Sequence, residues 1–378
     1  MVADCSGPLG GHIKCLWRDH ECPRDNTDCY HGTLQVTFNG ADIAGITNLI
    51  TGESYVRNPS PSTQLDLQLV QPPNASLVPA GAWTVDSSGS SATLTFTDSN
   101  RTVSARVSTD STGQQIVIDL DGKAKQGGVE RLVWGVTGFD TSAGQFILPA
   151  QGGLALNGSS LSAAGSYTFF RGGWETPFLL FQGKLGGVNV YSTDAKSLCK
   201  NLIVSAAFQQ TANAAIQIEA PGPWNTATEA GPVEWRLAAY TGDWQAGARI
   251  YRDWHNAAVP PAPLTGARAW ANNIRTVIEY ADAPPYKTSS LDSLAAVVNP
   301  AQTLLYLVDW RTNGYDVGYP DYTWDPSVPA FISYAHTLGF HVMLHTDALG
   351  VSPSSPDFAA VQQYQIKDPL TLAPQGWN

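Results

Sequence analysis

The chain has 378 residues, of which 43% are hydrophobic and 14% are charged, and its formal net charge is −11. This length exceeds one ordinary domain, so we expect two domains, or one and part of another. Binding to nucleic acid or to anionic membranes depends on clusters of Lys and Arg, and no basic run exceeds isolated pairs, so the charge argues against both classes of partner.

The first 31 residues form a cysteine-rich segment. It holds four of the five cysteines, interleaved with histidines, so two disulfides and a structural zinc site both fit its composition. The intervals of nine, six and six residues do not match paired C-x-x-C knuckles, which favours disulfides among Cys5, Cys15, Cys22 and Cys29. Reduced, inert thiols are a third alternative.

The N-terminal stretch lacks the apolar centre of a signal peptide, and no window reaches the roughly 18 consecutive apolar residues of a membrane-spanning helix. The chain is nevertheless rich in turn-forming and aromatic residues, with 35 Gly, 25 Pro, 12 Trp and 14 Tyr, a composition closer to extracellular proteins than to cytosolic helical ones. We therefore expect an extracellular or periplasmic protein without a membrane partner.

Residues 32–240 have the pattern of a β-rich domain. Short apolar alternations are separated by clusters of Gly, Asn, Asp, Ser and Pro, as in strands joined by tight turns. At 92–96 and 102–107 every second residue is apolar, which is typical of antiparallel strands with one buried face. So many strands predict a large β-sandwich. The sequence DLDG at 119–122 suggests half a calcium loop or, with better support, a hairpin turn.

Residues 241–266 form a connection. Apolar residues recur at steps of three and four from Trp244 to Ala258, which predicts an amphipathic helix that packs two tryptophans and a tyrosine. Thr241 or Asp243 is available as its N-cap. The Pro-rich stretch 259–266 ends the helix, because proline lacks the backbone donor, and marks a domain boundary.

Residues 267–378 alternate between strands and helices. Apolar runs at 274–280, 303–310 and 340–345 predict buried strands, and the stretches 289–298, 325–339 and 355–366 predict helices. The middle helix is well marked, with Asp325 as its cap, Pro326 at the first helical position and Gly339 past its end. This alternation predicts a parallel sheet covered by helices.

Polar and aromatic residues stand at the carboxyl end of each of these three predicted strands. They are Glu279, Tyr280, Asp309, Trp310, His345 and Asp347. In parallel α/β folds the carboxyl ends of the strands and the loops after them form the functional site. The opposite strand ends carry almost no charge, so the sequence predicts one site at the carboxyl ends.

The loop after the second strand adds carboxylates and planar aromatic rings. They are Asp316, Tyr319, Asp321 and Tyr322. A polyhydroxyl ligand uses this combination, because its hydroxyls bond to the acids while its C–H face stacks on a ring. Alternatively, these side chains only solvate the loop.

Each site residue has a structural alternative. Asp309 could cap a helix or pair with Arg311, and Trp310 is either a stacking platform or an ordinary rim aromatic. His345 could be a satisfied core histidine. The HTD sequence at 345–347 lacks a second ligand pair at metal spacing, so we predict no metal site there.

Other catalytic motifs are absent from the sequence. There is no G-x-S-x-G elbow, no Walker A loop and no G-x-G-x-x-G that opens a helix. We therefore expect no nucleotide or other cofactor.

The barrel-like part carries the most specific resemblance. The stretches LVDWRTNGYDVGYPDY and GFHVMLHTDALGVSP, preceded by ARIYRDWHN, resemble DUF6259-type glycosidase-like proteins, which are related to the α-galactosidase and endo-α-N-acetylgalactosaminidase clans of retaining glycoside hydrolases. The resemblance implies a multidomain β then α/β chain: a galactose-mutarotase-like β-supersandwich over 32–240, then the first, incomplete part of a (β/α)8 TIM barrel over 267–378.

The same resemblance implies which residues belong to the site. In those relatives the nucleophile is an Asp at the end of the fourth barrel strand, and the acid/base is a carboxylate from a later strand. A closed barrel takes about 250 residues, more than twice the length of 267–378, so both catalytic carboxylates are expected beyond Asn378. The residues that carry over form the substrate-binding wall, namely Asp309, Trp310, Asp316, His345 and Asp347.

Two functions follow as expectations. The first is the N-terminal portion of a secreted retaining glycoside hydrolase for α-linked, galactoside-like sugars, with an oligosaccharide or polysaccharide as partner and no activity in this chain alone. The second is a non-catalytic carbohydrate-binding or structural β-sandwich protein with a vestigial barrel. The sequence does not predict an oligomeric state.

Overall fold

The computed structural model describes residues 2–6, 12–18, 32–39, 42–57, 65–71, 77–80, 84–86, 91–161, 165–169, 173–207, 210–262, 264–347 and 349–376. The chain divides into two compact units, Met1–Pro260 and Pro261–Asn378. We call them the sandwich unit and the α/β unit.

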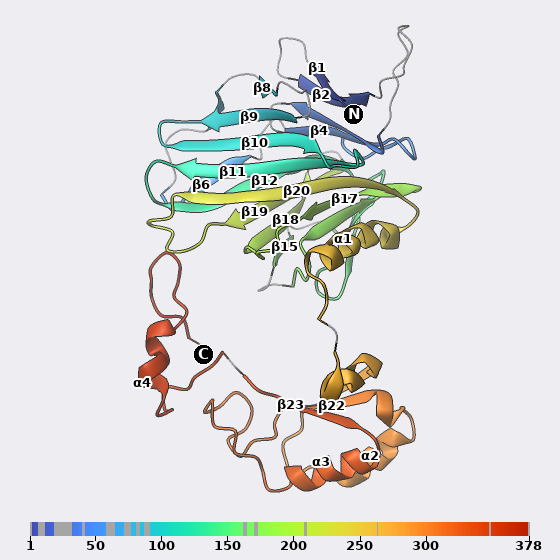
Figure 1. Ribbon diagram of the computed structural model, residues 1–378, viewed down its shortest axis with the longest axis vertical. Coiled ribbons are helices and arrows are strands. Elements are labelled where there is room, and N and C mark those ends of the chain that lie inside the picture. Colours follow the sequence, from blue (N-terminus) through green and yellow to red (C-terminus); the bar gives the residue numbers. More distant parts are fainter. Residues whose placement is uncertain are drawn as a thin grey trace. The chain divides into compact units, whose positions relative to one another are not determined.

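The sandwich unit contains two large β-sheets (Figure 1). The first has the strand order β1-β2-β3-β4-β12-β19-β18-β15, with β5 paired to β4 and β6 paired to β12. Its strands are β1 (Val2–Ser6), β2 (His12–Arg18), β3 (Leu34–Asn39), β4 (Asp42–Asn48), β5 (Glu53–Ser54), β6 (Asp66–Leu69), β12 (Val129–Asp140), β15 (Gly165–Thr168), β18 (Lys200–Ala207) and β19 (Thr211–Glu219).

The second sheet has the order β14-β13-β16-β17-β20-β11-β10-β9-β7, with β8 paired to β9. Its strands are β7 (Val78–Pro79), β8 (Thr84–Val85), β9 (Ser91–Thr97), β10 (Arg101–Thr109), β11 (Gln115–Ala124), β13 (Gln145–Leu148), β14 (Leu154–Leu156), β16 (Phe178–Gln182), β17 (Gly186–Ser192) and β20 (Glu229–Thr241).

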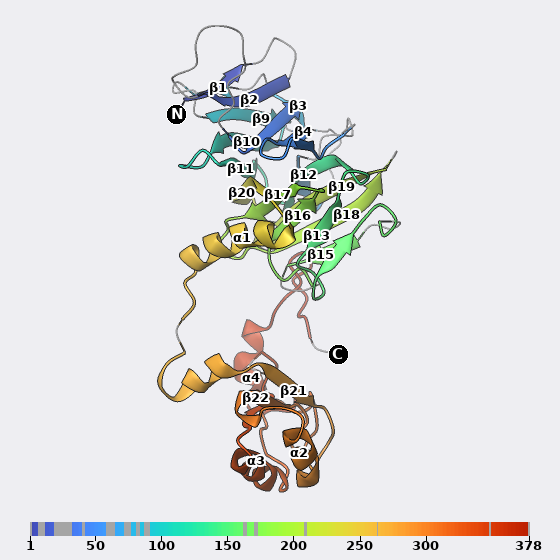
Figure 2. The ribbon, with the colours of Figure 1, turned by 90° about the vertical axis from the view of Figure 1, so that its right-hand side faces the viewer.

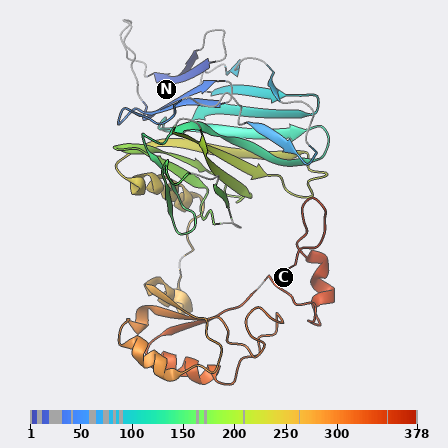
Figure 3. The ribbon, with the colours of Figure 1, turned by 180° about the vertical axis from the view of Figure 1, so that it is seen from behind.

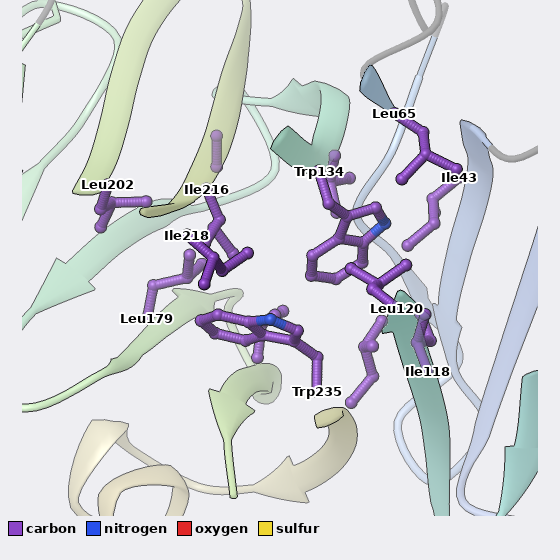
Figure 4. Close-up of a cluster of buried hydrophobic side chains, with 14 of the residues drawn as sticks. Ile43, Leu65, Ile118, Leu120, Trp134, Leu179, Leu202, Ile216, Ile218 and Trp235 are labelled. Carbon is purple, nitrogen blue, oxygen red and sulfur yellow. The ribbon is translucent and has the colours of Figure 1, made fainter. Parts of the chain in front are cut away.

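The two sheets pack face to face and bury one apolar core between them (Figure 2). Trp134 from β12 and Trp235 from β20 meet at the centre, with ring centroids 5.8 Å apart (Figure 4). The alternation expected at 92–96 and 102–107 is confirmed, because β9 and β10 pair antiparallel and bury alternate side chains. The predicted β-sandwich therefore forms by period-2 burial on both inner faces.

The hairpin turn predicted at 119–122 is wrong. These residues continue β11, whose register to β20 shifts between Leu120 and Gly122. A Cβ on Gly122 would lie 2.7 Å from the Leu67 side chain, so close packing explains this glycine. The acidic residues that resembled a turn lie on the solvent side of a strand instead.

The expected cysteine-rich segment is described only in part. Strands β1 and β2 pair antiparallel, and Cys5 lies opposite Cys15 in their register. Cys22 and Cys29 lie outside the described residues. The disulfides therefore stay a prediction.

Helix α1 (Trp244–Ala258) follows β20. Of the two expected caps, Thr241 and Asp243, the structure has Asp243, whose side chain accepts a hydrogen bond from the backbone N–H of Gln245. Tyr251 is buried against Tyr191 and Phe178 of the second sheet. The prediction that both tryptophans pack is only half right, because Trp254 packs there but Trp244 is 48% exposed.

The α/β unit contains a parallel three-stranded sheet with the order β21-β22-β23. Helices α2 and α3 lie on the same side of this sheet (Figures 1 and 3). The elements are η1 (Gly266–Asn273), β21 (Thr276–Tyr280), α2 (Thr288–Ala295), η2 (Pro300–Gln302), β22 (Thr303–Leu307), α3 (Val328–Thr337), β23 (His341–Leu344), α4 (Phe358–Val361) and η3 (Gln362–Tyr364).

The sheet buries one face more deeply than the other. Leu305 and Leu307 of β22 are fully buried in the core that α2 and α3 cover. On the opposite face, Val277 of β21 is 58% exposed and Met343 of β23 is 45% exposed. The apolar runs predicted strands buried on both faces, and the structure confirms this for one face only.

Helix α3 begins later than its sequence signals predicted. Asp325 instead accepts hydrogen bonds from the backbone N–H and the hydroxyl of Ser327, and the first helical residue is Val328. The predicted end is confirmed, because Gly339 has φ +93° and Phe340 donates its N–H back to Ala335, as in a Schellman motif. The last predicted helix is reduced to α4 and η3.

In the part of the chain that the structure describes, no helix is long and apolar enough to cross a membrane.

The sandwich unit also buries a charged pair. Lys200 on β18 is fully buried, and its Nζ lies 2.5 Å from Asp194 Oδ2. Burial lowers the pKa of Lys200, and the hydrogen bond and charge of Asp194 oppose this effect. Burial disfavours ionised Asp194, but Lys200 and the backbone N–H groups of Leu198 and Lys196 outweigh it and lower the pKa of this carboxyl. The ionised form of each residue is thus stabilised by the opposite charge of the other.

We expect Lys200→Met to lower the free energy of unfolding by about 3 kcal/mol, because it leaves the Asp194 carboxylate buried without its counterion. Arg252→Ala is the matched control, since Arg252 and Asp253 form an exposed pair with 60% and 66% exposed side chains. It should change stability by less than about 0.5 kcal/mol. Hydrogen exchange of β18 peptides measures both variants, and equal effects would contradict the prediction.

The same pair predicts a pH dependence. A carboxyl whose pKa is lower in the folded state contributes stability above its ordinary pKa, here 3.8, and loses this contribution as the pH falls through the lowered value. We therefore expect Asp194→Asn to make the loss of stability below pH 4 shallower than in the unmodified chain. Urea unfolding at a series of pH values tests this, with Asp253→Asn as the exposed control.

Candidate functional site

The parallel register of the three strands brings their carboxyl ends to one edge of the sheet. Tyr280, Leu307 and Leu344 lie side by side in the register, so the residues after them meet at the same edge. We call residues 308–327 the β22 loop, and residues 345–347 and 349–357 the β23 loop. Glu279 is exposed near the end of β21 and Tyr280 is the last residue of that strand, whereas the other expected site residues lie in these two loops.

Trp310 lies in the core of the α/β unit. It is 4% exposed, and its indole Nε1 donates a hydrogen bond of 2.7 Å to the carbonyl of His345. Its ring lies parallel to that of Tyr322 at 6.1 Å. The geometry therefore gives Trp310 a packing role that holds the two loops together, and leaves its ring little surface on which a ligand could stack.

His345 joins the strand to the loop. The Tyr306 hydroxyl and His345 Nδ1 are hydrogen-bonded, and His345 Nε2 lies 3.8 Å from Asp316 Oδ1. In the tautomer whose Nδ1 accepts from Tyr306, Nε2 carries the ring proton and faces this carboxylate. Asp316 itself has φ +54°, a left-handed conformation that is costly for a residue other than glycine.

Tyr319 fixes the position of the Asp316 carboxylate. Its hydroxyl donates a 3.1 Å hydrogen bond to Asp316 Oδ1. Burial, followed by this hydrogen bond to a carboxylate, raises the pKa of Tyr319 to about 12, although the charge of Arg311 acts in the other direction. The phenol therefore stays protonated and remains a donor at neutral pH.

Three polar atoms of the site are buried and have no hydrogen-bond partner among the described residues. They are Asp309 Oδ1, His345 Nε2 and Asp347 Oδ2. The second oxygen of Asp347 is satisfied by the backbone N–H groups of Leu349 and Gly350. Buried polar atoms ordinarily have partners, because an unpaired one costs about 1–3 kcal/mol. Three such atoms on two neighbouring loops make this edge the candidate site.

Hydrogen bonds tie the β22 and β23 loops together. Tyr322 donates its hydroxyl to the carbonyl of Asp347 at 2.7 Å, and the N–H of Ser352 donates to the carbonyl of Tyr319 at 2.8 Å. A Cβ on Gly350 would lie 2.6 Å from Asp347 Oδ2 and 3.7 Å from the Tyr319 ring. The expected residues Asp316, His345 and Asp347 thus lie on two loops that are joined by hydrogen bonds.

The structure adds an aromatic residue that sequence reasoning missed. Tyr315 is 49% exposed, and its ring centroid lies 5.1 Å from that of His345. Trp324 at the far end of the same loop is 61% exposed. Only an exposed ring of this loop can contact a ligand. The sequence has four aromatic residues within ten positions, and no pattern in it indicates which of them is exposed.

The residues that the structure describes include no group of three or more His, Cys, Asp or Glu side chains that could hold a metal ion. The unpartnered atoms at this edge belong to the carboxylates of Asp309 and Asp347 and to the imidazole of His345, which lies next to the exposed phenol ring of Tyr315.

No protein-family model and no curated protein matches the chain. Among solved structures, it is similar to the α-N-acetylgalactosaminidase NagBb from Bifidobacterium bifidum in complex with GalNAc, with a TM-score of 0.61 and 10% identity over 99% of this chain and 64% of that one. The same enzyme in complex with Gal-NHAc-DNJ gives a TM-score of 0.62 and 11% identity, over 94% and 60% of the two chains.

The GH36 α-galactosidase AgaB from Geobacillus stearothermophilus matches with a TM-score of 0.46 and 14% identity, over 98% of this chain and 60% of that one. At such identities, the similarity to NagBb shows a shared fold alone. The chain has a β-sandwich-rich, glycoside hydrolase-like fold. It spans less than two thirds of the length of these neighbours.

We expect Asp309→Ala to stabilise the α/β unit by about 1 kcal/mol, because it removes a buried acceptor that has no partner. Asp325→Ala is the matched control on the same loop, since Asp325 accepts two hydrogen bonds from Ser327 and its removal should destabilise the unit. Hydrogen exchange of β22 peptides compares the two variants. If Asp309→Ala also destabilised the unit, the unpaired state of Asp309 would be refuted.

Proposed function

We propose that the chain is the N-terminal portion of a retaining glycoside hydrolase that acts on α-linked, galactoside-like sugars. It would supply a β-supersandwich and one wall of the sugar pocket. The observation that carries the proposal is the set of unpartnered buried atoms on Asp309, His345 and Asp347 at the carboxyl edge of the parallel sheet. The glycosidase-like fold and the resemblance to DUF6259-type proteins support it.

The chemistry of these atoms suits a sugar. Carboxylate oxygens of Asp309 and Asp347 accept hydrogen bonds from hydroxyl groups, and the Nε2–H of His345 donates to a hydroxyl oxygen. Adjacent hydroxyls of a hexopyranose present both functions on neighbouring carbons. The exposed ring of Tyr315 beside His345 offers a face against which the apolar C–H side of the sugar packs.

The proposed catalytic architecture extends beyond this chain. The three parallel strands would be the first of a (β/α)8 barrel, since both β21 and β23 are edge strands in the described part of the chain. The remaining strands and both catalytic carboxylates, about 5 Å apart in a retaining enzyme, would come from beyond Asn378. The complete protein would then cleave the bond, and this chain alone would only bind the sugar.

We expect the chain to bind galactose or N-acetylgalactosamine weakly, and Tyr315→Ala to reduce the affinity about tenfold through the loss of ring packing. Tyr364→Ala is the matched control, because Tyr364 is an 80% exposed tyrosine on η3. Saturation-transfer NMR with each sugar, and with mannose for comparison, measures the effect.

The outcomes separate two parts of the proposal. Binding that Tyr315→Ala and Tyr364→Ala weaken equally would refute the assigned wall. A coding sequence that continues past residue 378 without a carboxylate after a fourth strand would refute the hydrolase and leave a non-catalytic sugar-binding protein.

A further inference from the structure

Arg311 is a buried cation whose partners are backbone carbonyls. It is 3% exposed, and its Nη1 donates to the carbonyls of Val317 and Asp321 at 3.0 and 2.9 Å. Its Nη2 donates to the carbonyl of Gly314 at 2.8 Å. No ion pair among the described residues includes Arg311, so the pairing with Asp309 weighed from the sequence does not occur.

The guanidinium also stacks on the aromatic residues of its own loop. Its central carbon lies 4.0 Å from the centroid of the Tyr319 ring and 5.9 Å from that of Tyr322. A cation at this distance is attracted to the negative face of the ring, more strongly where water is excluded. Three carbonyls and two rings therefore replace the counterion that a buried charge ordinarily requires.

The hydrogen bonds of Arg311 hold three points of the β22 loop backbone around the guanidinium. The carbonyls that Arg311 binds lie on both sides of Asp316, at Gly314 and Val317, and a third lies at Asp321. Backbone hydrogen bonds close the loop at its base, where the N–H of Thr312 donates to Thr323 and that of Asp325 donates to Trp310. The cation thus holds the segment in which Asp316 adopts its left-handed conformation.

We propose that Arg311 is the positioning residue of the site and acts through Tyr319. The guanidinium orients the Tyr319 ring, the Tyr319 hydroxyl donates to Asp316 Oδ1, and this oxygen faces His345 Nε2. Arg311 touches none of the unpartnered atoms itself. It determines where the Asp316 carboxylate lies relative to the His345 imidazole.

The planar fork of arginine is what this arrangement needs. Its separate Nη1 and Nη2 groups reach carbonyls at different points of the loop, while its flat face stacks on a ring. A lysine ammonium is a compact, strongly hydrated charge with no flat face to stack. The charge alone therefore does not reproduce the geometry.

The test uses the complete 378-residue chain with ¹⁵N-labelled histidine. There are seven histidines, and the pair of ring-nitrogen signals lost in His345→Gln belongs to His345; the Nε2 signal of this pair is the His345 signal followed below. We expect Arg311→Gln and Arg311→Lys to shift the His345 signal, and Tyr319→Phe to shift it in the same direction, because each releases Asp316. Arg252→Gln, at an exposed arginine of α1, is the control and should leave the signal unchanged.

A double-mutant comparison shows whether Arg311 acts through Tyr319. Tyr319→Phe keeps the ring beneath the guanidinium and removes only the hydroxyl, so Arg311→Gln should move the His345 signal less in this background than in the unmodified chain. Full additivity would overturn the proposed route. An unchanged His345 signal in Arg311→Lys, or in all three single variants, would overturn the positioning role.

The sugar arm of the test rests on the proposed function. If the chain binds galactose, Arg311→Lys should weaken binding about tenfold while the thermal midpoint of the sandwich unit stays constant. A shifted His345 signal in a chain that binds no sugar would support the role of Arg311 and refute the proposed function. Sugar binding with unaltered affinity and an unaltered His345 signal in Arg311→Lys would refute the role of Arg311 alone.

Discussion

The parallel register of β21, β22 and β23 is the constraint on which the candidate site depends. Parallel strands place all their carboxyl ends at one edge, so loops that are far apart in the sequence begin as neighbours. This proximity allows the indole of Trp310 to donate a hydrogen bond to the carbonyl of His345, directly after β23. The site is thus assembled by strand pairing first, and side-chain hydrogen bonds then fix the loops that the strands deliver.

The β22 loop contains one buried polar residue with several partners and another with an unpartnered oxygen. The guanidinium of Arg311 donates hydrogen bonds to three carbonyls and lies over two aromatic rings. Asp309, two positions earlier, keeps one buried oxygen without a partner. Both kinds of burial cost free energy. The satisfied cation shapes the loop, whereas the unpartnered oxygen of Asp309 is one of the atoms that we propose bind a sugar.

Local patterns predicted much of the fold, and tertiary contacts decided the rest. Period-2 alternation identified β9 and β10, and the cap at Asp243 and the glycine at 339 marked helix ends, because each signal acts within a few residues. The expected site residues do lie at one edge. Their individual roles could not be predicted, since the burial of Trp310 and the exposure of Tyr315 depend on packing between two loops.

The strands of the α/β unit are apolar on both faces, but helices cover only one of these faces. Strands with both faces apolar occur where both faces are buried. Here helices cover the face of Leu305 and Leu307, while Val277 and Met343 on the other face remain about half exposed. Burial of such side chains stabilises a protein by roughly 25 cal/mol per Å². A second covering layer, such as the interior of the barrel that we propose, would bury this surface. The edges of β21 and β23, which have no further partner strand in the described part of the chain, support the same proposal.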